Sequence, residues 1–268
     1  MRTVKNIIRK IIFGIENITN SQITIKLKPR IKIKVHPDAV SDGTSMQFYV
    51  DLVENFCNFK PKNIFEIGAN YAQDAEFLRK SFDIEERNVY VFEPHPQIFS
   101  EIKKMYKFNS FDLAVSNERG KTVFHAIDIT NNEYKNTGIS SLRDGLTTNK
   151  KNFFDIEVEL IRMDDFIQQE RIESIDFLKL DVEGMNYEVL EGFGDYLSYV
   201  KAIQTEGEYL QYWKDQKLYS DIEEILLKNN FKLISFVLSD GGVQSDSFWV
   251  QDKYLKQPYI NKSINEKE

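Results

Sequence analysis

The sequence predicts an α/β protein with a doubly wound, largely parallel sheet of the Rossmann-like type. From about residue 47 onward, short apolar segments with strand character alternate with segments of helical periodicity, which is typical of a parallel sheet covered by helices. In addition, the strand 64–67 runs into a small-residue turn at Gly68, and the next strand, 89–92, ends at the acid Glu93. This order of strand, glycine turn, helix and acid-ended strand is the layout of a nucleotide-binding βαβ unit.

The remaining elements follow without internal repeats. In order we expect a helix over 48–59, strand 64–67, a helix that begins near Ala72, strand 89–92, a helix over 98–105, strand 111–115, β segments at 122–127 and 155–161, a helix from Asp164, strand 175–180, a helix after Gly184, strand 200–205, a helix over 219–229, and closing strands 232–238 and 247–250. The two β segments border a polar stretch, 128–152, which contains the run 138–142. A loop of this length in a compact domain is usually functional or mobile.

Residues 1–40 differ from the rest and are interpreted as a basic N-terminal extension. Isoleucines recur there at helical spacing, and alternating apolar residues on both sides of Pro29 predict a hairpin. One interpretation is an anchor on an anionic membrane surface or on a partner in glycan assembly. The favoured one is an extension packed on the main domain or in a homodimer, because short amphipathic elements mostly face a core. The main domain is expected over 45–255, and a polar tail over 256–268.

Composition argues against several classes of protein. The 268 residues are 41% hydrophobic and 29% charged, which is ordinary for a globular protein. The formal net charge of -7 argues against a nucleic-acid partner. The single cysteine, Cys57, provides neither a disulfide nor a cysteine-based metal site, and neither a bilayer-spanning apolar run nor a signal peptide is evident. We therefore expect a cytoplasmic protein, peripheral at the inner face of the membrane if the basic extension is an anchor.

The first turn has one glycine where a dinucleotide-binding turn has three. Gly68 stands alone, Ala72 occupies a place where another glycine could stand, and Glu66 precedes the turn. A pyrophosphate cradle is therefore not expected, and the acid ahead of the turn would repel phosphate. These features favour a cationic nucleoside without phosphate, namely S-adenosylmethionine, over NAD(P) as the cofactor.

A further acidic strand end lies in the run 177–184, which reads Phe-Leu-Lys-Leu-Asp-Val-Glu-Gly. Strand alternation places Lys179, Asp181 and Glu183 on one side of this strand, unless the following turn redirects Glu183. Because ligands of open α/β sheets bind outside the carboxyl ends of the strands, Glu66, Glu93 and Asp181 are expected at one rim. A single acid at a strand end is usually a cap or a turn residue, so the convergence of three acids is what predicts a site.

In these motifs the chain resembles the FkbM family of S-adenosylmethionine-dependent methyltransferases. The resemblance spans roughly residues 60–206 and rests on the stretches 65–70, 91–94, 113–116, 140–142 and 177–184. The run Lys-Leu-Asp-Val-Glu-Gly in the last stretch is the most specific of them. The resemblance implies the class I methyltransferase form of the fold.

Carried over position by position, the resemblance also implies a cofactor site along the carboxyl ends of the strands. The residues implied are Glu66, Gly68, Ala69, Asn70, Glu93, Pro94, Asp112 and Asp181. Glu66 and the backbone of 68–70 would face the methionine part of the cofactor, and Glu93 would face the ribose. Asp112 or its neighbours would lie by the adenine, and Asp181 near the transferred methyl group.

Two places depart from the pattern of the family. Ala72 stands where the family usually has glycine. Because alanine has poor access to positive φ, we expect an adjusted turn there rather than lost binding. Met185 and Asn186 lie in a segment where the family often has an acid, so no role is carried over to them.

A carboxylate or histidine at the rim could take the proton of an acceptor hydroxyl. The catalytic candidates are Asp181, His95 and Glu206, with Glu183, His125 and Glu208 as further candidates. Lys179 could instead pair with Asp181 and hold it ionised. His95 lies in an extended loop between two prolines, and Glu206 is expected in a turn after the strand 200–205.

Some of the same acids offer hard oxygen ligands to a divalent cation. Asp181, Glu206 and Glu208 are the ligands that they would provide. Contacts with a sugar or with the sulfonium already account for these acids, so a metal is not favoured and no metal site is predicted.

Aromatic residues follow the Glu-Gly-Glu run in the sequence. They are Tyr209, Tyr212, Trp213 and Tyr219. Aromatic faces beside carboxylates suit a sugar, because they cover its apolar C–H patches while the acids accept its hydroxyls. Ordinary helix packing explains them equally well, so both interpretations stay open.

The resulting expectation is an enzyme that moves a methyl group from S-adenosylmethionine to an oxygen. The family implies a sugar hydroxyl of a bacterial surface glycan, or of its nucleotide- or lipid-linked precursor, as the acceptor. Two alternatives are a methyltransferase of a small secondary metabolite and a non-catalytic glycan-assembly protein that keeps the fold. The basic N-terminus slightly favours the non-catalytic protein, whereas Glu66, Glu93 and Asp181 together favour an enzyme. The missing glycines disfavour an NAD(P)-dependent oxidoreductase.

Overall fold

The computed structural model describes residues 32–256 apart from positions 40, 42, 44, 131–135 and 147–149. The predicted N-terminal helix, most of the predicted hairpin and the tail beyond 256 lie outside the described residues. Residues 32–36, the described part of the second hairpin limb, are not a strand, so this part of the prediction is wrong. They contact the main domain instead, where the His36 ring stacks on Tyr71 with 4.0 Å between ring centroids.

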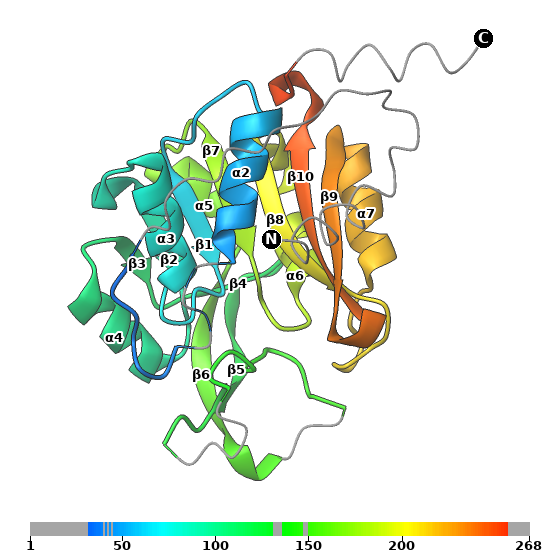
Figure 1. The fold of residues 1–268 in the computed structure, drawn as a ribbon. Coiled ribbons are helices and arrows are strands. Elements are labelled where there is room, and N and C mark those ends of the chain that lie inside the picture. Colours follow the sequence, from blue (N-terminus) through cyan, green and yellow to red (C-terminus); the bar gives the residue numbers. More distant parts are fainter. Residues whose placement is uncertain are drawn as a thin grey trace.

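A seven-stranded sheet forms the centre of the molecule (Figure 1). Its strands are β1 Ile64–Ile67, β2 Val89–Phe92, β3 Asn109–Phe111, β7 Ile175–Leu180, β8 Val200–Glu208, β9 Phe231–Ser239 and β10 Gln244–Gln251. They are arranged in the order β3-β2-β1-β7-β8-β10-β9. All pairs from β3 to β8 are parallel, and β10 is antiparallel to both of its neighbours. The predicted α/β fold with a largely parallel sheet is confirmed.

Helices cover both faces of this sheet, as a doubly wound fold requires (Figure 1). The helices α2 Met46–Phe56, α3 Gln73–Phe82 and α4 Pro96–Met105 pack on one face, and α5 Met163–Glu170, α6 Asn186–Gly192 and α7 Tyr219–Lys228 pack on the other. Short 3-10 helices lie at Glu86–Asn88, Lys150–Asn152, Gly194–Tyr199, Asp240–Gly242 and Asp252–Tyr254. No helix among the described residues is long and apolar enough to cross a membrane.

Side-chain alternation along the central strands places a polar row on one face of the sheet. In β1, Ile64 joins the core under α2 and α3, and Phe65 joins the opposite core. Glu66 therefore faces the side of α2 and α3. In register, Glu66 lies beside Lys179 of β7, and Lys179 lies beside Gln204 of β8. Three polar side chains thus cross the sheet in a row next to the carboxyl ends of its strands.

The predicted strand 111–115 is wrong as a single element. The chain leaves the large sheet at the end of β3, and Ala114–Val115 forms β4 of a second, three-stranded sheet with the order β4-β6-β5. Its other strands, β5 Gly120–Ile127 and β6 Phe153–Ile161, confirm the two predicted β segments. The split occurs because β4 pairs in parallel with the end of β6, a partner that lies far away in the sequence.

The strand β8 is longer than predicted. It continues to Glu208 because β10 pairs with it in antiparallel register as far as Gln244. Glu206 and Glu208 are therefore strand residues rather than turn residues, contrary to the prediction. The other predicted helices and strands begin and end within a few residues of their observed bounds.

Candidate active site

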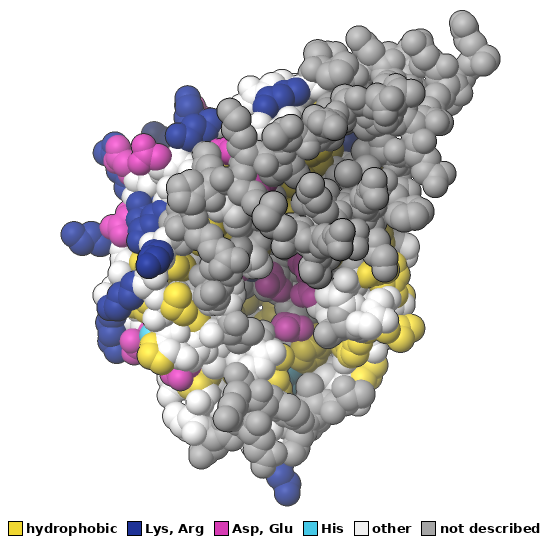
Figure 2. Space-filling view, viewed as in Figure 1, with side chains coloured by type: hydrophobic (Ala, Val, Ile, Leu, Met, Phe, Trp, Pro, Cys, Tyr) yellow, Lys and Arg dark blue, Asp and Glu magenta, His cyan; other side chains and the backbone are white. Residues whose placement is uncertain are grey.

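A cavity of about 560 Å³ opens at the carboxyl ends of β1 and β7. The strand order changes direction between these two strands, and ligands of open α/β sheets bind at such a switch point. The wall comes from the β1–α3 turn, from Glu93 and Pro94 after β2, from the segment 136–142, and from the ends of β7 and β8. Figure 2 shows acidic side chains in a hollow near the centre of the face drawn there.

Gly68 allows two strand ends to approach each other closely. Its φ is +80°, and a Cβ atom at this position would lie 2.0 Å from the carbonyl oxygen of Asp181. Only glycine fits such a contact. On the other side, the amides of Gly68 and Ala69 both donate to the carbonyl of Phe92 at 3.1 Å. The turn after β1 is thereby fixed against both of its neighbouring strands.

Ala72 keeps a backbone conformation that glycine would favour. Its φ is 55° and its ψ is 31°, in the left-handed region, and its side chain is fully buried. The prediction that the turn adjusts to avoid positive φ is therefore wrong. Ala72 adopts the left-handed backbone conformation at a cost of about 1–2 kcal/mol. Burial of the methyl group and a 2.7 Å hydrogen bond from the Ala72 amide to the Ala69 carbonyl hold this conformation.

Glu66 of β1 lies in the cavity wall and contacts the first turn of α3. One carboxylate oxygen accepts a hydrogen bond from the Ala75 amide at 3.1 Å, and the other lies 3.5 Å from Nζ of Lys179. Burial raises the pKa of Glu66 to about 8, although the Lys179 charge works in the opposite direction. The predicted cofactor acid thus also satisfies a backbone amide in the first turn of α3.

Glu93 braces the loops that follow β1 and β2. One of its oxygens accepts a hydrogen bond from the Asn70 amide and the other from the His95 amide, both at 2.8 Å. Burial raises the pKa of Glu93 to about 7, although these two hydrogen bonds lower it. The Asn70 side chain in turn donates to Thr137 at 3.1 Å. Glu93 therefore supports the shape of the cavity wall in addition to lining it.

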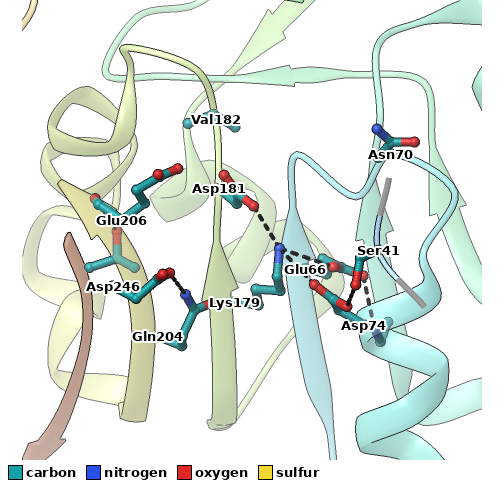
Figure 3. Close-up of polar contacts among 12 residues, drawn as sticks. Ser41, Glu66, Asn70, Asp74, Lys179, Asp181, Val182, Gln204, Glu206 and Asp246 are labelled. Carbon is teal, nitrogen blue, oxygen red and sulfur yellow. Dashed lines mark hydrogen bonds and ion pairs between the residues drawn. The ribbon is translucent and has the colours of Figure 1, made fainter. Parts of the chain in front are cut away.

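Lys179 is the centre of a charge network at the floor of the cavity (Figure 3). Its Nζ lies 2.9 Å from Asp181, 3.3 Å from Asp74 and 3.5 Å from Glu66. Burial alone would lower the pKa of Lys179, but the three carboxylates raise it well above its ordinary value. Asp181 is only partly buried; desolvation alone would raise its pKa, but Lys179 outweighs this effect and the pKa of Asp181 is lowered. The sequence indicates that Lys179 could pair with Asp181, and this ion pair is present in the structure.

Further acids surround Asp181. Burial, together with the charge of Asp181, raises the pKa of Glu206 to about 10. Burial also raises the pKa of Glu183 to about 8 and that of Asp246, which pairs with Glu206 across β8 and β10, to about 6. A hydrogen bond from Glu206 helps to keep the pKa of Asp181 low. At neutral pH the site therefore combines an ionised Asp181 with a protonated Glu206.

The wall of the cavity is strongly acidic. Among the described lining residues the acids are Glu66, Asp74, Glu93, Asp181, Glu183, Glu206 and Glu208, and the only Lys or Arg is Lys179. Such a wall offers phosphate no cation besides Lys179, which is paired with Asp181, and it suits a cation or a neutral hydroxyl. It fits S-adenosylmethionine, which carries a sulfonium and an ammonium group. No group of three or more His, Cys, Asp or Glu side chains in the described part of the chain is arranged to hold a metal ion.

His95, a predicted catalytic residue, lies outside the cavity wall. It is the residue before α4, and its fully buried ring packs edge-on against Phe154. Its Nε2 lies 2.9 Å from the carbonyl oxygen of Ile127, and burial lowers the pKa of the ring. These contacts hold the ring behind the cavity wall, so the structure does not bring His95 to Asp181.

Two further predicted residues also lie away from the cavity. Asp112 is exposed, and its neighbour Leu113 lines the wall instead. His125 lies on β5, where its Nδ1 contacts Asp155 at 2.6 Å. The structure therefore gathers Glu66, the 68–70 turn, Glu93, Pro94, Asp181 and Glu206 at the cavity, but neither Asp112 nor the histidines.

The aromatic residues after β8 divide into two pairs. Tyr212 and Trp213 line the cavity, and the Trp213 ring packs so closely on Gly184 that a Cβ atom there would lie 2.7 Å from it. Tyr209 and Tyr219 pack against each other and against Phe236. Ordinary packing therefore accounts for Tyr209 and Tyr219, whereas contact of Tyr212 and Trp213 with a sugar stays a prediction.

Three residues of the site were missed by the reasoning from sequence. Asp74 accepts a 2.7 Å hydrogen bond from Ser41, and both line the cavity, so the segment ahead of α2 contributes to its wall. Asp246 faces Glu206 from β10. An acid in the first turn of the helix after the glycine turn was a usable signal for Asp74. Ser41 and Asp246 reach the site through tertiary packing, which leaves no local signal.

Known proteins resemble the chain over this same region. Residues 66–233, more than half of the chain, match the methyltransferase FkbM domain. Over 203 residues the chain is 29% identical to the 2-O-methyltransferase NoeI of Sinorhizobium fredii (strain NBRC 101917 / NGR234). The aligned region covers 72% of this chain and 74% of that protein.

Solved structures give a weaker similarity. The methyltransferase FkbM from Methylobacillus flagellatus KT has a TM-score of 0.47 and 10% identity, over 79% of this chain and 55% of that chain. The magnesium protoporphyrin IX methyltransferase of Synechocystis PCC 6803 has a TM-score of 0.42 and 10% identity, over 78% of this chain and 79% of that chain. At these scores neither structure supports an inference about the site.

Proposed function

Since the chain belongs to the methyltransferase FkbM domain family and is an S-adenosylmethionine-dependent methyltransferase, we propose that it methylates a hydroxyl oxygen of a sugar, in a bacterial surface glycan or in its precursor. One observation carries this proposal. The ionised Asp181 stands at the cavity beside Glu206, where it can accept the proton of a hydroxyl. The similarity to a 2-O-methyltransferase supports oxygen as the methylated atom.

The roles of the residues follow from their places in the wall. Glu66, Glu93 and the backbone of 68–70 would hold the cofactor through hydrogen bonds and charge. The bound cofactor supplies a methyl group that its sulfonium already activates. Asp181 takes the hydroxyl proton of the acceptor, which turns a poor nucleophile into a better one. Holding the acceptor in line can contribute several kcal/mol to the lowering of the barrier.

The acidic wall also restricts the form of the acceptor. A neutral sugar hydroxyl can enter without charge repulsion, and Tyr212 and Trp213 offer faces for its C–H patches. A diphosphate inside the cavity would face several carboxylates with Lys179 as its single cationic contact among the described lining residues. For a nucleotide- or lipid-linked precursor, the diphosphate is therefore expected outside the cavity.

Binding and transfer assays test the proposal. Calorimetry of the full chain should detect S-adenosylmethionine and S-adenosylhomocysteine and no comparable affinity for NAD. Methyl-labelled cofactor should then label neutral oligosaccharides, and mass spectrometry of the surface glycan with and without the gene should show the loss of one methyl group. Transfer only to phenolic or polyketide hydroxyls would refute the sugar acceptor. Cofactor binding without transfer to any hydroxyl would favour a non-catalytic protein.

A further inference from the structure

Two charged neighbours at the end of β7 differ in their access to the cavity. Only 5% of the Lys179 side chain is exposed, against 41% of the Asp181 side chain. An acceptor in the cavity therefore meets Asp181, whereas the ammonium group of Lys179 lies behind it. An effect of Lys179 on an acceptor hydroxyl is therefore expected mainly through Asp181.

The contacts of Lys179 distinguish Asp181 from its other partners. Its Nζ lies within ion-pair distance of three carboxylates, but it donates its hydrogen bond to Oδ2 of Asp181 at 2.9 Å. Asp74 is already held by Ser41, and Glu66 by the Ala75 amide. With Oδ2 of Asp181 fixed by Lys179, the exposed part of this carboxylate can meet an acceptor hydroxyl.

We propose that Lys179 is a positioning residue that keeps the Asp181 carboxylate ionised and directed into the cavity for removal of the hydroxyl proton. The inference rests on the proposed function and deepens it. In the transfer, the acceptor oxygen bonds to the methyl carbon and the carbon–sulfur bond breaks with its electron pair left on sulfur. The hydroxyl proton passes to Asp181, so that charge and atoms balance.

The surroundings of Asp181 explain why a cation is needed there. The titratable groups that face Lys179 and Asp181 are Glu66 of β1, Asp74 of α3, Tyr49 of α2, Glu183 of the turn after β7, Glu206 and Glu208 of β8, and Asp246 of β10. All but Tyr49 are acids, and burial favours the protonated form of Asp181, whereas Lys179 and the hydrogen bond from Glu206 favour its ionised form. The Nζ of Lys179 lies 2.9 Å from Oδ2 of Asp181, and Lys179 is the only Lys or Arg among the described lining residues. Its loss should therefore favour the protonated form of Asp181, which cannot accept a proton.

The pH dependence of turnover by Lys179→Met tests the inference, because methionine keeps the length of the side chain and removes its charge. The acidic limb of the kcat profile should move to higher pH by about 1–3 pH units. A carbon-13 titration of the aspartate carboxyls in the cofactor-free protein, with the Asp181 signal assigned by Asp181→Asn, should show the same displacement. A uniform loss of activity with an unmoved limb and an unmoved carboxyl titration would overturn the inference.

Two further variants sharpen the test. Lys201→Met also removes a lysine from a strand, but Lys201 pairs with Asp176, and neither residue lines the cavity. It should leave the acidic limb in place, and a displacement equal to that of Lys179→Met would overturn the inference. Asp74→Asn removes a competing acid and should move the limb to lower pH, which keeps the idea testable if Lys179→Met does not fold; a move to higher pH would contradict it.

The failure of this inference can be told apart from failure of the proposed function. If the unaltered chain methylates no sugar hydroxyl, the proposed function fails. If it does so and Lys179→Met shows no displaced limb, only the role of Lys179 fails. The carboxyl titration gives the same distinction without turnover.

Discussion

At the scale of single residues, Ala72 and Glu93 show how neighbours decide what a side chain does. Ala72 has a left-handed backbone because its buried methyl group and its amide are held by the surrounding turn. The sequence predicts that Glu93 faces the ribose of the cofactor. In the structure its two carboxylate oxygens accept hydrogen bonds from two backbone amides. Neither property follows from the residue type alone. Both can be measured by substitution.

Replacement of Ala72 by glycine should change the free energy of unfolding little. Glycine relieves the left-handed strain of about 1–2 kcal/mol but loses a buried methyl group worth about 0.8 kcal/mol, and it also gains chain entropy when unfolded. Ala75 is equally buried but lies inside α3, so Ala75→Gly should cost about 1.5–2 kcal/mol. Urea unfolding of the two variants checks the contrast. Equal losses would show that Ala72 is not strained.

Glu93→Ala should weaken the cofactor affinity by about 1.5–3 kcal/mol and also lower the free energy of unfolding by about 1–3 kcal/mol. The second effect is expected because the Asn70 and His95 amides lose their acceptor. Glu85→Ala is a suitable control, since Glu85 is an exposed acid ahead of the same strand and should change stability by less than about 0.5 kcal/mol. Calorimetry measures the cofactor affinity, and urea unfolding measures the free energy of unfolding. Unchanged affinity in Glu93→Ala would remove this residue from the cofactor site.

At the scale of elements, two segments far apart in the sequence build one side of the cavity together. The segment 141–146 bonds to the segment 212–214 through the pairs Leu146–Tyr212 and Lys214–Asp144. Arg143 joins this pair to the end of β7, because its guanidinium donates to the carbonyls of Gly184 and Lys214 and to the carboxylate of Glu188. Tyr212 and Trp213 are held at the cavity by this arrangement.

Arg143→Met should therefore raise the KM for the acceptor by about tenfold or more, as expected when hydrogen bonds to a charged group worth about 1.5–3 kcal/mol are lost. The dissociation constant of the cofactor should change little, because the 68–70 turn and Glu93 are held by other contacts. Arg119→Met removes an exposed ion pair with Asp165 and is the matched control. Steady-state kinetics with cofactor titrations separates the two constants. A loss of cofactor affinity equal to the loss of acceptor affinity would contradict this role of the segment.

Elements with strong local patterns could be predicted, and elements defined by distant partners could not. The buried strand β7 and the glycine turn after β1 follow directly from their apolar runs and small residues. The split between β3 and β4 and the extension of β8 depend on pairing with β6 and β10. The same distinction holds in the site, where Asp181 and Glu66 end patterned strands but Ser41 arrives from a segment without any pattern.

At the scale of the whole molecule, the fold concentrates acidic groups at one rim of its sheet. The row Glu66–Lys179–Gln204 and the pair Glu206–Asp246 arise from strand register, and Asp181 follows directly after β7 where these strands end. Burial leaves several of these acids with pKa values far above their ordinary range. The largely parallel, doubly wound sheet could be expected from the alternation of elements, but this accumulation of acidic groups depends on the register of the strands.

The buried acids should make the stability of the cofactor-free protein fall as pH rises from about 5 to about 8. Glu93, Glu66 and Glu183 have folded-state pKa values of about 7, 8 and 8, above those of an unfolded chain. Between the unfolded and folded values the native state binds more protons, so the free energy of unfolding decreases with pH. Urea unfolding at several pH values measures the slope. Constant or rising stability across this window would contradict the electrostatic account.

The central claim is that Asp181 removes the proton of the acceptor hydroxyl, and the kinetics of Asp181→Asn test it most directly. The amide keeps the size of the side chain and removes its charge and basicity, so kcat should fall by about 10²–10⁴. The cofactor dissociation constant should change only a few-fold, and the control Asp165→Asn on the exposed face of α5 should retain its activity. Near-normal turnover in Asp181→Asn would contradict the account, as would a loss explained entirely by weaker cofactor binding.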